Sequence, residues 1–372
     1  MRNLVAFIYD DSLSSHVLRE GHPMKPVRLK YTYDLLRSYG AFDQSGQIVK
    51  PRHATLDELT TFHTRSYVDA VERFGVNGDG PDMGRYNFTD IGDNPVYPGM
   101  FDAARLSTGG SLVAAELVAS GSVNTAFNIG GGLHHAAVDH ASGFCIFNDP
   151  VIAIKYLVSK GMRVAYVDID AHHGDGVQNA FYETDQVLTI STHESGQFLF
   201  PGTGFVDEIG TGQGRGYAVN VPLFPYTGDE TYLDIFDQVV LPLVKAFNPD
   251  VLVSQLGIDT HFNDPITHLR LSSRAFTKAV SLLAGLGMPW IALGGGGYDV
   301  QAVARCWTLA YGEMTNKVWP EEIPTSYSDI HGQTELRDED VSHPNKEIRD
   351  QIASHTQSIL VDIKRLVFPF YS

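Results

Sequence analysis

The stretch RVAYVDIDAHHGDGVQ, residues 163–178, decides the fold class of this chain. It opens on an apolar, β-branched run, residues 163–167, and then turns acidic and histidine-rich at residues 168–176. A short apolar run of this kind is typical of a strand that is buried on both faces of a parallel sheet. Six similar runs predict further strands at residues 4–9, 123–129, 187–191, 217–221, 251–256 and 290–293.

Segments with helical periodicity lie between these predicted strands. They cover residues 108–119, 151–158, 232–245, 273–286 and 302–311, and an amphipathic segment follows at residues 348–367. The alternation of strand and helix predicts an α/β fold with a wide, mostly parallel sheet and helices on both faces. No linker or repeat divides residues 1–372, so we expect one domain, with a long loop at residues 75–98 and a helical tail at about 320–372.

Composition excludes several classes of protein. The 372 residues are 43% hydrophobic and carry 44 Asp+Glu against 27 Lys+Arg, a formal charge of -17. This charge repels phosphate backbones, so direct nucleic-acid binding is not expected, and no apolar run approaches the ~20 residues that span a bilayer. The only cysteines, Cys145 and Cys306, exclude a disulfide framework and favour a cytoplasmic protein. The oligomeric state stays open.

Polar residues gather where four of the predicted strands end. These clusters occupy residues 130–135, 168–176, 257–261 and 294–298. Ligands of open parallel sheets bind at the carboxyl ends of the strands. We therefore expect the functional site to be built from these four clusters.

The second cluster predicts a metal site. On an extended chain Asp168, Asp170 and His172 point to one side, and two carboxylates and an imidazole repel one another unless a cation lies between them. Such ligands suit zinc, iron(II) or manganese, and Asp259 is the natural third protein ligand. The alternative is a set of helix N-caps, with Asp175 starting a helix at residues 176–182 and Asp259 starting another.

Two further clusters predict acid–base and oxyanion chemistry. His134 and His135 follow three glycines, and adjacent histidines on a tight turn can both face a ligand and act as general base and acid. Asp168 and Asp175 are the available carboxylates behind them. The glycines of residues 294–297 do not match a phosphate loop, because no Lys-Ser/Thr follows, but they deliver the hydroxyl of Tyr298 to the site.

In this order, these segments resemble the histone deacetylase superfamily, and most closely the class I-like zinc-dependent deacetylases and their bacterial acetoin-utilisation-type relatives. The likeness covers about residues 9–310. The matching segments are HPMKP (22–26) with Arg28, LSTGGS (106–111), GGLHHA (131–136), GFC (143–145), DIDAHHGDGVQ (168–178), FPGTG (200–204), NVP (220–222), QLGIDT (255–260), GGGGY (294–298) and RCWT (305–308).

The resemblance implies an arginase-like fold and hydrolysis of N-ε-acyl-lysine in proteins or peptides. It implies that zinc, or alternatively iron(II), is held by Asp170, His172 and Asp259. It gives catalytic roles to His134 and His135 as tandem base and acid, Asp168 and Asp175 as their carboxylates, and Tyr298 as the group that polarises the acyl carbonyl.

The resemblance also implies substrate contacts and two potassium sites. The lysine chain would pass Gly143, Phe144, Phe200, Ile266 and Gly296, with Asp93 at the rim. One potassium site would use Asp168, Asp170, His172, Ser191 and Thr192, and the other Phe181, Thr184, Val187 and Tyr217.

Three alternatives stay open. An acetylpolyamine or other small acetyl-amide hydrolase is disfavoured, because no glutamate stands near residues 265–267. A ureohydrolase with two metals needs a second Asp-x-Asp, where this chain has Asp259, Thr260 and His261. A non-catalytic regulatory relative would have lost a ligand, a histidine or the tyrosine, and none is missing. Leu199 and Ile266 depart from the family pattern and point to an altered acyl or sequence preference.

Overall fold

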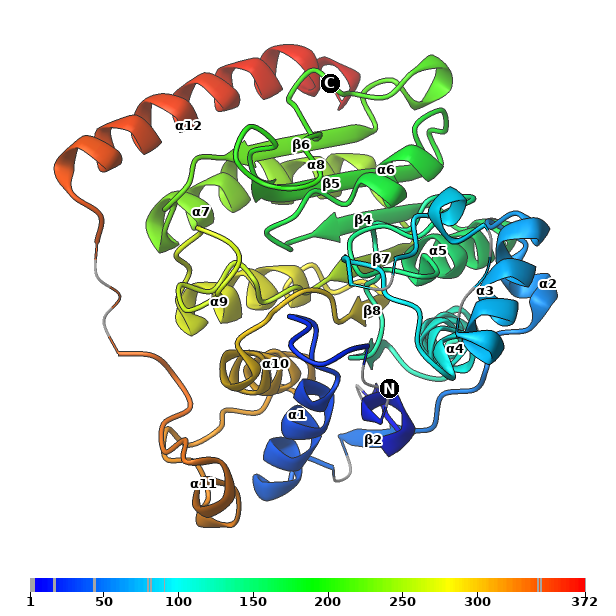
Figure 1. Cartoon of the computed structure of the whole chain (residues 1–372). Helices are drawn as coiled ribbons and strands as arrows, with labels where there is room; N and C mark the ends of the chain where they lie inside the picture. Colours follow the sequence, from blue (N-terminus) through cyan, green and yellow to red (C-terminus); the bar gives the residue numbers. More distant parts are fainter. Residues whose placement is uncertain are drawn as a thin grey trace.

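A parallel sheet of eight strands forms the centre of the molecule (Figure 1). The computed structural model describes residues 4–15, 18–42, 45–78, 80, 82–89, 91–339, 341 and 343–371. Across the sheet the strand order is β2-β1-β3-β8-β7-β4-β5-β6, and every neighbouring pair is parallel. The strands are β1 (Val5–Ile8), β2 (Gly46–Val49), β3 (Thr125–Asn128), β4 (Val164–Asp168), β5 (Val187–Glu194), β6 (Ala218–Leu223), β7 (Val251–Gln255) and β8 (Trp290–Leu293).

Helices cover both faces of the sheet (Figure 1). They are α1 (Val27–Ser38), α2 (Leu56–Leu59), α3 (Arg65–Asn77), α4 (Met100–Ala119), α5 (Asp149–Ser159), α6 (Asp175–Ala180), α7 (Asp229–Ile235), α8 (Leu241–Phe247), α9 (Ser273–Ala284), α10 (Val300–Thr315), α11 (Thr325–His331) and α12 (Lys346–Leu366). A π-helical turn, Phe236–Val240, joins α7 to α8. No described helix is long and apolar enough to cross a membrane.

The alternation of side chains along each strand explains why an apolar core lies on each face of the sheet. In β1, Val5 and Phe7 pack into a core that also holds side chains of α1, α9 and α10. Ala6 and Ile8 point the other way, into a core with α4 and α5. Successive strand residues face opposite sides of a sheet, and all four residues of β1 are buried, so both faces need an apolar cover.

The predicted fold class is confirmed, and all seven predicted strands are present. The prediction missed β2, a short edge strand whose Gln47 and Ile48 are exposed, and it missed α1 and α3. The predicted long loop begins later than expected, because α3 continues to Asn77, and residues 79, 81 and 90 of that loop lie outside the described residues.

His63 is a buried histidine on the α4–α5 side of the sheet, and it shows how burial affects a pKa. Its side chain is 2% exposed, and its Nε2 accepts the backbone N–H of Asn148 at 3.0 Å. Loss of solvation disfavours the charged imidazolium and lowers the pKa of His63 to about 4. The folded protein therefore keeps His63 neutral at pH values where the unfolded chain protonates it.

We expect His63→Gln to flatten the pH dependence of folding stability. Below about pH 6.5 the imidazole of His63 is protonated in the unfolded wild-type chain but stays neutral in the folded protein. The free energy of unfolding therefore falls as the pH drops toward 4. At ~1.4 kcal/mol per pKa unit, His63 alone accounts for about 3 kcal/mol of that fall. Glutamine keeps an acceptor for the Asn148 amide but does not titrate. Urea unfolding at several pH values checks this, and equal slopes for wild type and variant would contradict it.

Candidate active site

The four polar clusters meet at one edge of the sheet, because they follow the adjacent strands β3, β8, β7 and β4. Asp168 is the last residue of β4, and the chain bends at residues 170–172. The prediction that Asp170 and His172 project from an extended chain was therefore wrong in its geometry. The bend brings the two side chains together, because the backbone N–H of His172 donates to Asp170 Oδ1 at 3.0 Å.

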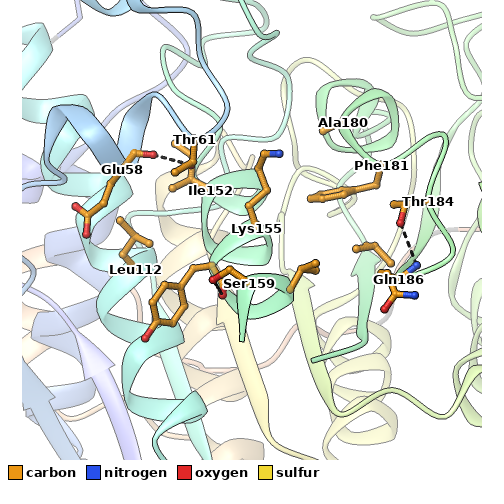
Figure 2. A pocket seen from close by; sticks show the side chains of 13 residues that line it. Glu58, Thr61, Leu112, Ile152, Lys155, Ser159, Ala180, Phe181, Thr184 and Gln186 are labelled. Atoms are coloured by element: carbon orange, nitrogen blue, oxygen red, sulfur yellow. Dashed lines mark hydrogen bonds between the residues drawn. The ribbon is translucent and has the colours of Figure 1, made fainter. Parts of the chain in front are cut away.

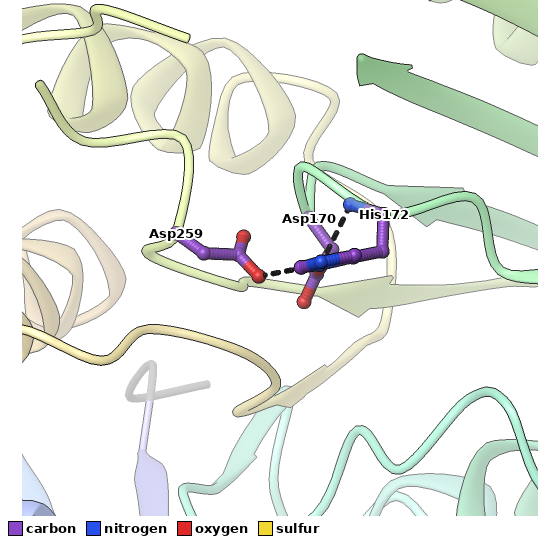
Figure 3. A group of neighbouring side chains, drawn as sticks. All are labelled: Asp170, His172 and Asp259. Atoms are coloured by element: carbon purple, nitrogen blue, oxygen red, sulfur yellow. Dashed lines mark hydrogen bonds and ion pairs between the residues drawn. The ribbon is translucent and has the colours of Figure 1, made fainter. Parts of the chain in front are cut away.

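Asp170, His172 and Asp259 form a compact group of potential metal ligands (Figure 3). One ligand atom from each lies within 4.8 Å of the others, and all three residues are buried. His172 Nδ1 lies 3.1 Å from Asp170 Oδ1 and 2.9 Å from Asp259 Oδ2. Asp259 caps no described helix, which excludes the N-cap alternative for it, whereas Asp175 does begin a helix as the first residue of α6.

The remaining oxygens of the two carboxylates are anchored by the protein. Asp170 Oδ2 accepts Gln255 Nε2 at 2.6 Å and the backbone N–H of Gly296 at 2.8 Å. Asp259 Oδ1 accepts the N–H of Ala171 at 2.7 Å. A Cβ on Gly296 would overlap Asp259 Oδ2, so a glycine is required there. Each aspartate thus has one anchored oxygen and presents the other to His172.

The donor set fits a divalent cation. Burial and the neighbouring charge of Asp170 raise the pKa of Asp259 above its usual value. Two buried carboxylates this close cannot both ionise without a compensating positive charge. Two oxygens and an imidazole nitrogen are ligands that zinc and iron(II) accept. In the described part of the chain, this is the one group of three such side chains with metal-binding spacing.

His134 and His135 lie on a turn after β3, each backed by a carboxylate. His134 Nδ1 lies 2.7 Å from Asp168 Oδ2, and His135 Nδ1 lies 2.7 Å from Asp175 Oδ1. The two Nε2 atoms are 3.0 Å apart. The predicted pairing of both histidines with Asp168 and Asp175 is therefore present in the structure.

The two imidazoles have opposite proton affinities. Burial lowers the pKa of His134, but the carboxylates of Asp168 and Asp170 outweigh it and raise that pKa to about 9. Burial and the charge of His134 lower the pKa of His135 to about 4, although Asp175 opposes them. With His134 protonated, its Nδ1 donates to Asp168, while neutral His135 donates from Nδ1 to Asp175 and keeps its lone pair on Nε2. Of the two imidazoles, His134 therefore has the higher proton affinity, and His135 Nε2 is the available base.

Tyr298 stands at the end of the glycine turn after β8. Arg28, which is buried, donates to the carbonyls of Gly297 at 2.8 Å and Gly295 at 2.6 Å. The N–H of Tyr298 donates to Asp264 Oδ2 at 2.9 Å, and its ring packs perpendicular to His172 at 6.4 Å. Burial and the nearby carboxylates raise the pKa of Tyr298 well above its usual value, so its phenol remains a hydrogen-bond donor.

A cavity of about 10 Å³ is lined by both histidines, Asp170, Gly296 and Tyr298 among others. Roughly 10–15 Å³ is the space that one water molecule needs. The two histidines, Asp170 of the potential metal ligands and the residue that carries the phenol therefore line a space large enough for about one water molecule.

The predicted substrate residues Gly143, Phe144 and Phe200 adjoin this group. The Phe200 ring lies 5.1 Å from the His135 ring and is 44% exposed, so it joins the site to the surface. Phe144 packs on Tyr298 at 5.7 Å and has a positive φ of 68°. A Cβ on Gly143 would overlap His135. These three residues therefore lie directly beside the histidines and Tyr298.

Asp93 and Ile266 belong to two outer loops. Asp93 is exposed, and its backbone carbonyl lies 3.2 Å from His22 Nε2, while the His22 ring packs on Phe144 at 4.7 Å. Ile266 is partly exposed, and its N–H donates to Asp264 Oδ1 at 3.0 Å. Each loop is thus tied to a residue that contacts Phe144 or Tyr298.

The residues of the first predicted potassium site lie together. Asp168 is in register with Ser191 on β5, and Thr192 Oγ1 donates to the Asp168 carbonyl at 3.3 Å. In the second set, Phe181, Thr184 and Val187 line a surface hollow of about 580 Å³ beside α5 and α6 (Figure 2). Tyr217 does not line it, although its carbonyl accepts the Thr189 N–H at 2.9 Å. This hollow contains none of the potential metal ligands.

Several residues that hold the site in place were not predicted from the sequence. Gln255 anchors Asp170, and a polar residue at the end of the apolar run 251–256 was the available signal. Asp149 accepts the N–H groups of Gly132 at 3.0 Å and Leu133 at 2.8 Å and so fixes the turn before His134. No local pattern marks Asp149 for this role, because its partners lie 16 and 17 residues away.

Comparison with known proteins assigns this arrangement to a family. Residues 22–314 match the histone deacetylase domain. The chain is 42% identical over 334 residues to the acetoin utilization protein AcuC of Bacillus subtilis (88% of this chain, 86% of that protein), and 39% identical over 326 residues to human histone deacetylase 1 (87% and 67%). The crystal structure of an HDAC homologue from Aquifex aeolicus superposes with a TM-score of 0.86 at 33% identity and covers 95% of this chain and 100% of its own.

Proposed function

Because the chain is a member of the histone deacetylase family and is of the bacterial AcuC type, we propose that it removes acetyl or other short acyl groups from lysine side chains of proteins or peptides. The observation that carries this proposal is the placement of the Asp170–His172–Asp259 group beside the adjacent histidines and Tyr298. An amide hydrolysis needs positive charge at the carbonyl, a base for water and an acid for the leaving amine. The site offers groups suited to all three tasks.

In this proposal Asp170, His172 and Asp259 hold zinc, or alternatively iron(II). Bound there, the metal would supply positive charge to polarise the acyl carbonyl and to acidify water. Tyr298 donates its phenol hydrogen to the carbonyl oxygen as negative charge develops there. Its raised pKa keeps that hydrogen in place.

The two histidines divide the proton transfers. His135, which is neutral, takes a proton from the attacking water and returns one to the leaving lysine amine. His134 stays protonated against Asp168 and stabilises negative charge in the site. Asp175 fixes the tautomer of His135 through its hydrogen bond to Nδ1.

The substrate side of the proposal uses the aromatic approach. Phe144 and Phe200, with Gly143, Gly296 and Ile266, enclose the lysine methylenes, and Asp93 at the rim binds the substrate backbone. The two predicted potassium sites remain part of the proposal. The cysteines Cys145 and Cys306 are buried free thiols, as is usual in a reducing compartment, which supports a cytoplasmic location.

A substrate panel tests this proposal. We expect the zinc- or iron(II)-loaded protein to deacetylate an acetyl-lysine peptide with a kcat/KM at least about tenfold above that for an acetylated polyamine, with one divalent metal per chain. Amine release and metal titration are the measurements. A preference for the acetylpolyamine would transfer the function to small amides. Two metals per chain and urea release from a guanidino substrate would identify a ureohydrolase.

A further inference from the structure

Asp338 lies beyond residue 314, where the match to the family domain ends, yet it contacts the back of the active-site loop. The chain leads from α11 past α10 toward α12 (the orange segment in Figure 1). On this path Asp338 turns inward and is only 8% exposed. A buried carboxylate is costly unless charged or hydrogen-bonding partners satisfy it, so its partners indicate its role.

Both carboxylate oxygens of Asp338 are satisfied by separate elements. Oδ1 pairs with Arg305 Nη2 of α10 at 2.8 Å. Oδ2 accepts His261 Nε2 at 2.9 Å and the N–H of Ser273, at the start of α9, at 2.7 Å. The N–H of Asp338 donates to Ser273 Oγ at 2.9 Å. One side chain thus joins α9, α10 and the loop after β7.

His261 transmits this contact to the loop. Its Nδ1 accepts the N–H of Asn263 at 3.2 Å, so its Nε2 carries the hydrogen that Asp338 accepts. Its carbonyl accepts the N–H of Asp264 at 2.8 Å, and its own N–H donates to Ile258 at 3.0 Å. His261 is 2% exposed, so no water competes for these bonds.

This loop carries three groups that the proposed reaction uses. Asp259 is a proposed metal ligand, Asp264 accepts the N–H of Tyr298, and Ile266 lies at the rim. A shift of the loop would therefore change the position of the metal ligand and of the phenol together.

We infer that Asp338 is a positioning residue for the metal site, which acts through His261 to hold the loop of Asp259 and Asp264 in place. This inference rests on the proposed function. By this inference, the segment between α11 and α12 helps to hold the active site in place. In metal sites, outer residues that hydrogen-bond to the ligands hold them in position. Loss of such residues weakens metal binding about 10- to 100-fold.

The test is a zinc titration against a competing chelator. In Asp338→Asn one oxygen becomes an NH₂ group, which faces either Arg305 or the donors of His261 and Ser273, so the set of contacts cannot be kept. We expect the zinc Kd to rise about tenfold or more. His261→Asn keeps an acceptor near the Asn263 amide but cannot reach Asp338, and it should raise the Kd to a similar extent. The zinc Kd of the double variant should lie within twofold of the Kd of the weaker-binding single variant.

Two matched controls separate positioning from general stability. Arg337→Ala breaks the neighbouring surface pair with Glu321, which does not touch the loop, and should leave the zinc Kd unchanged. Ile363→Ala removes buried volume from α12 and should lower the Tm with the Kd unchanged. In steady-state assays Asp338→Asn should lower kcat about tenfold and change KM less than threefold, because Asp259 and Asp264 serve the reacting centre.

Unchanged zinc affinity in Asp338→Asn and His261→Asn would overturn the inference, as would additive effects in the double variant. If Asp338→Asn does not fold, His261→Asn decides alone by the same criterion. Absence of turnover on acetyl-lysine by the wild-type protein would overturn the proposed function instead. The zinc titration would still decide the role of Asp338.

Discussion

Replacing His135 with alanine is expected to lower kcat for an acetyl-lysine peptide by about 10²- to 10⁴-fold. The variant loses the neutral imidazole that lies 3.0 Å from His134 and 2.7 Å from Asp175, and with it the group that accepts and returns the proton. KM should change little, because the aromatic approach and the potential metal ligands remain. Steady-state kinetics, together with the metal content of the variant, check this result.

His140→Ala is the matched control for this variant. His140 follows in the same segment, but its side chain is 45% exposed and pairs with Asp139 at 2.8 Å. We expect wild-type kcat from it. Turnover by His135→Ala within threefold of wild type, at full metal content, would remove His135 from the mechanism.

Replacing Tyr298 with phenylalanine is expected to lower kcat by about 10²- to 10³-fold, the usual cost of one lost oxyanion donor. Phenylalanine keeps the ring packing on His172 and Phe144, and the backbone bond to Asp264 does not depend on the side chain. The loss should therefore appear in kcat and in kcat/KM equally, as for an interaction made only in the transition state. Steady-state kinetics on the same peptide measure it.

Tyr39→Phe is the matched substitution elsewhere. The Tyr39 hydroxyl donates to the carbonyl of Pro320 at 3.1 Å, away from the four polar clusters, so its loss should leave kcat unchanged. An unchanged kcat in Tyr298→Phe would mean that the metal ligands and histidines suffice for the carbonyl. A raised KM with normal kcat would give Tyr298 a role in substrate binding only.

Much of the fold could be predicted from the sequence, because the central strands are buried on both faces and therefore stand out as apolar runs. The edge strand β2 could not, since Gln47 and Ile48 are exposed and its four residues carry no clear pattern. The helix α3 was missed although its caps were visible. Thr64 accepts the N–H of Tyr67, and Gly78 ends the helix with a positive φ of 78°.

The candidate site could be predicted as far as its residues follow strands. His134, Asp170, Asp259 and Tyr298 each stand just after an apolar run, and parallel strands bring such positions to one edge. The residues that hold these side chains in position could not be predicted in this way. Gln255 meets Asp170 from another strand, 85 residues away, and Asp338 meets His261 across 77 residues. Contacts of this kind depend on strand order and on the path of the tail, which no local pattern encodes.

The strand order has a consequence for how the protein is made. β8, the last strand of the sheet to leave the ribosome, inserts between β3 and β7. Until Leu293 has been synthesised, both neighbours present unpaired edges, and such edges are templates for aggregation. Tyr298 follows β8 directly, so a nascent chain cannot complete the site while it is still short of its central strand. During translation, the sheet is therefore completed at nearly the same time as Tyr298 is added to the chain, late in synthesis.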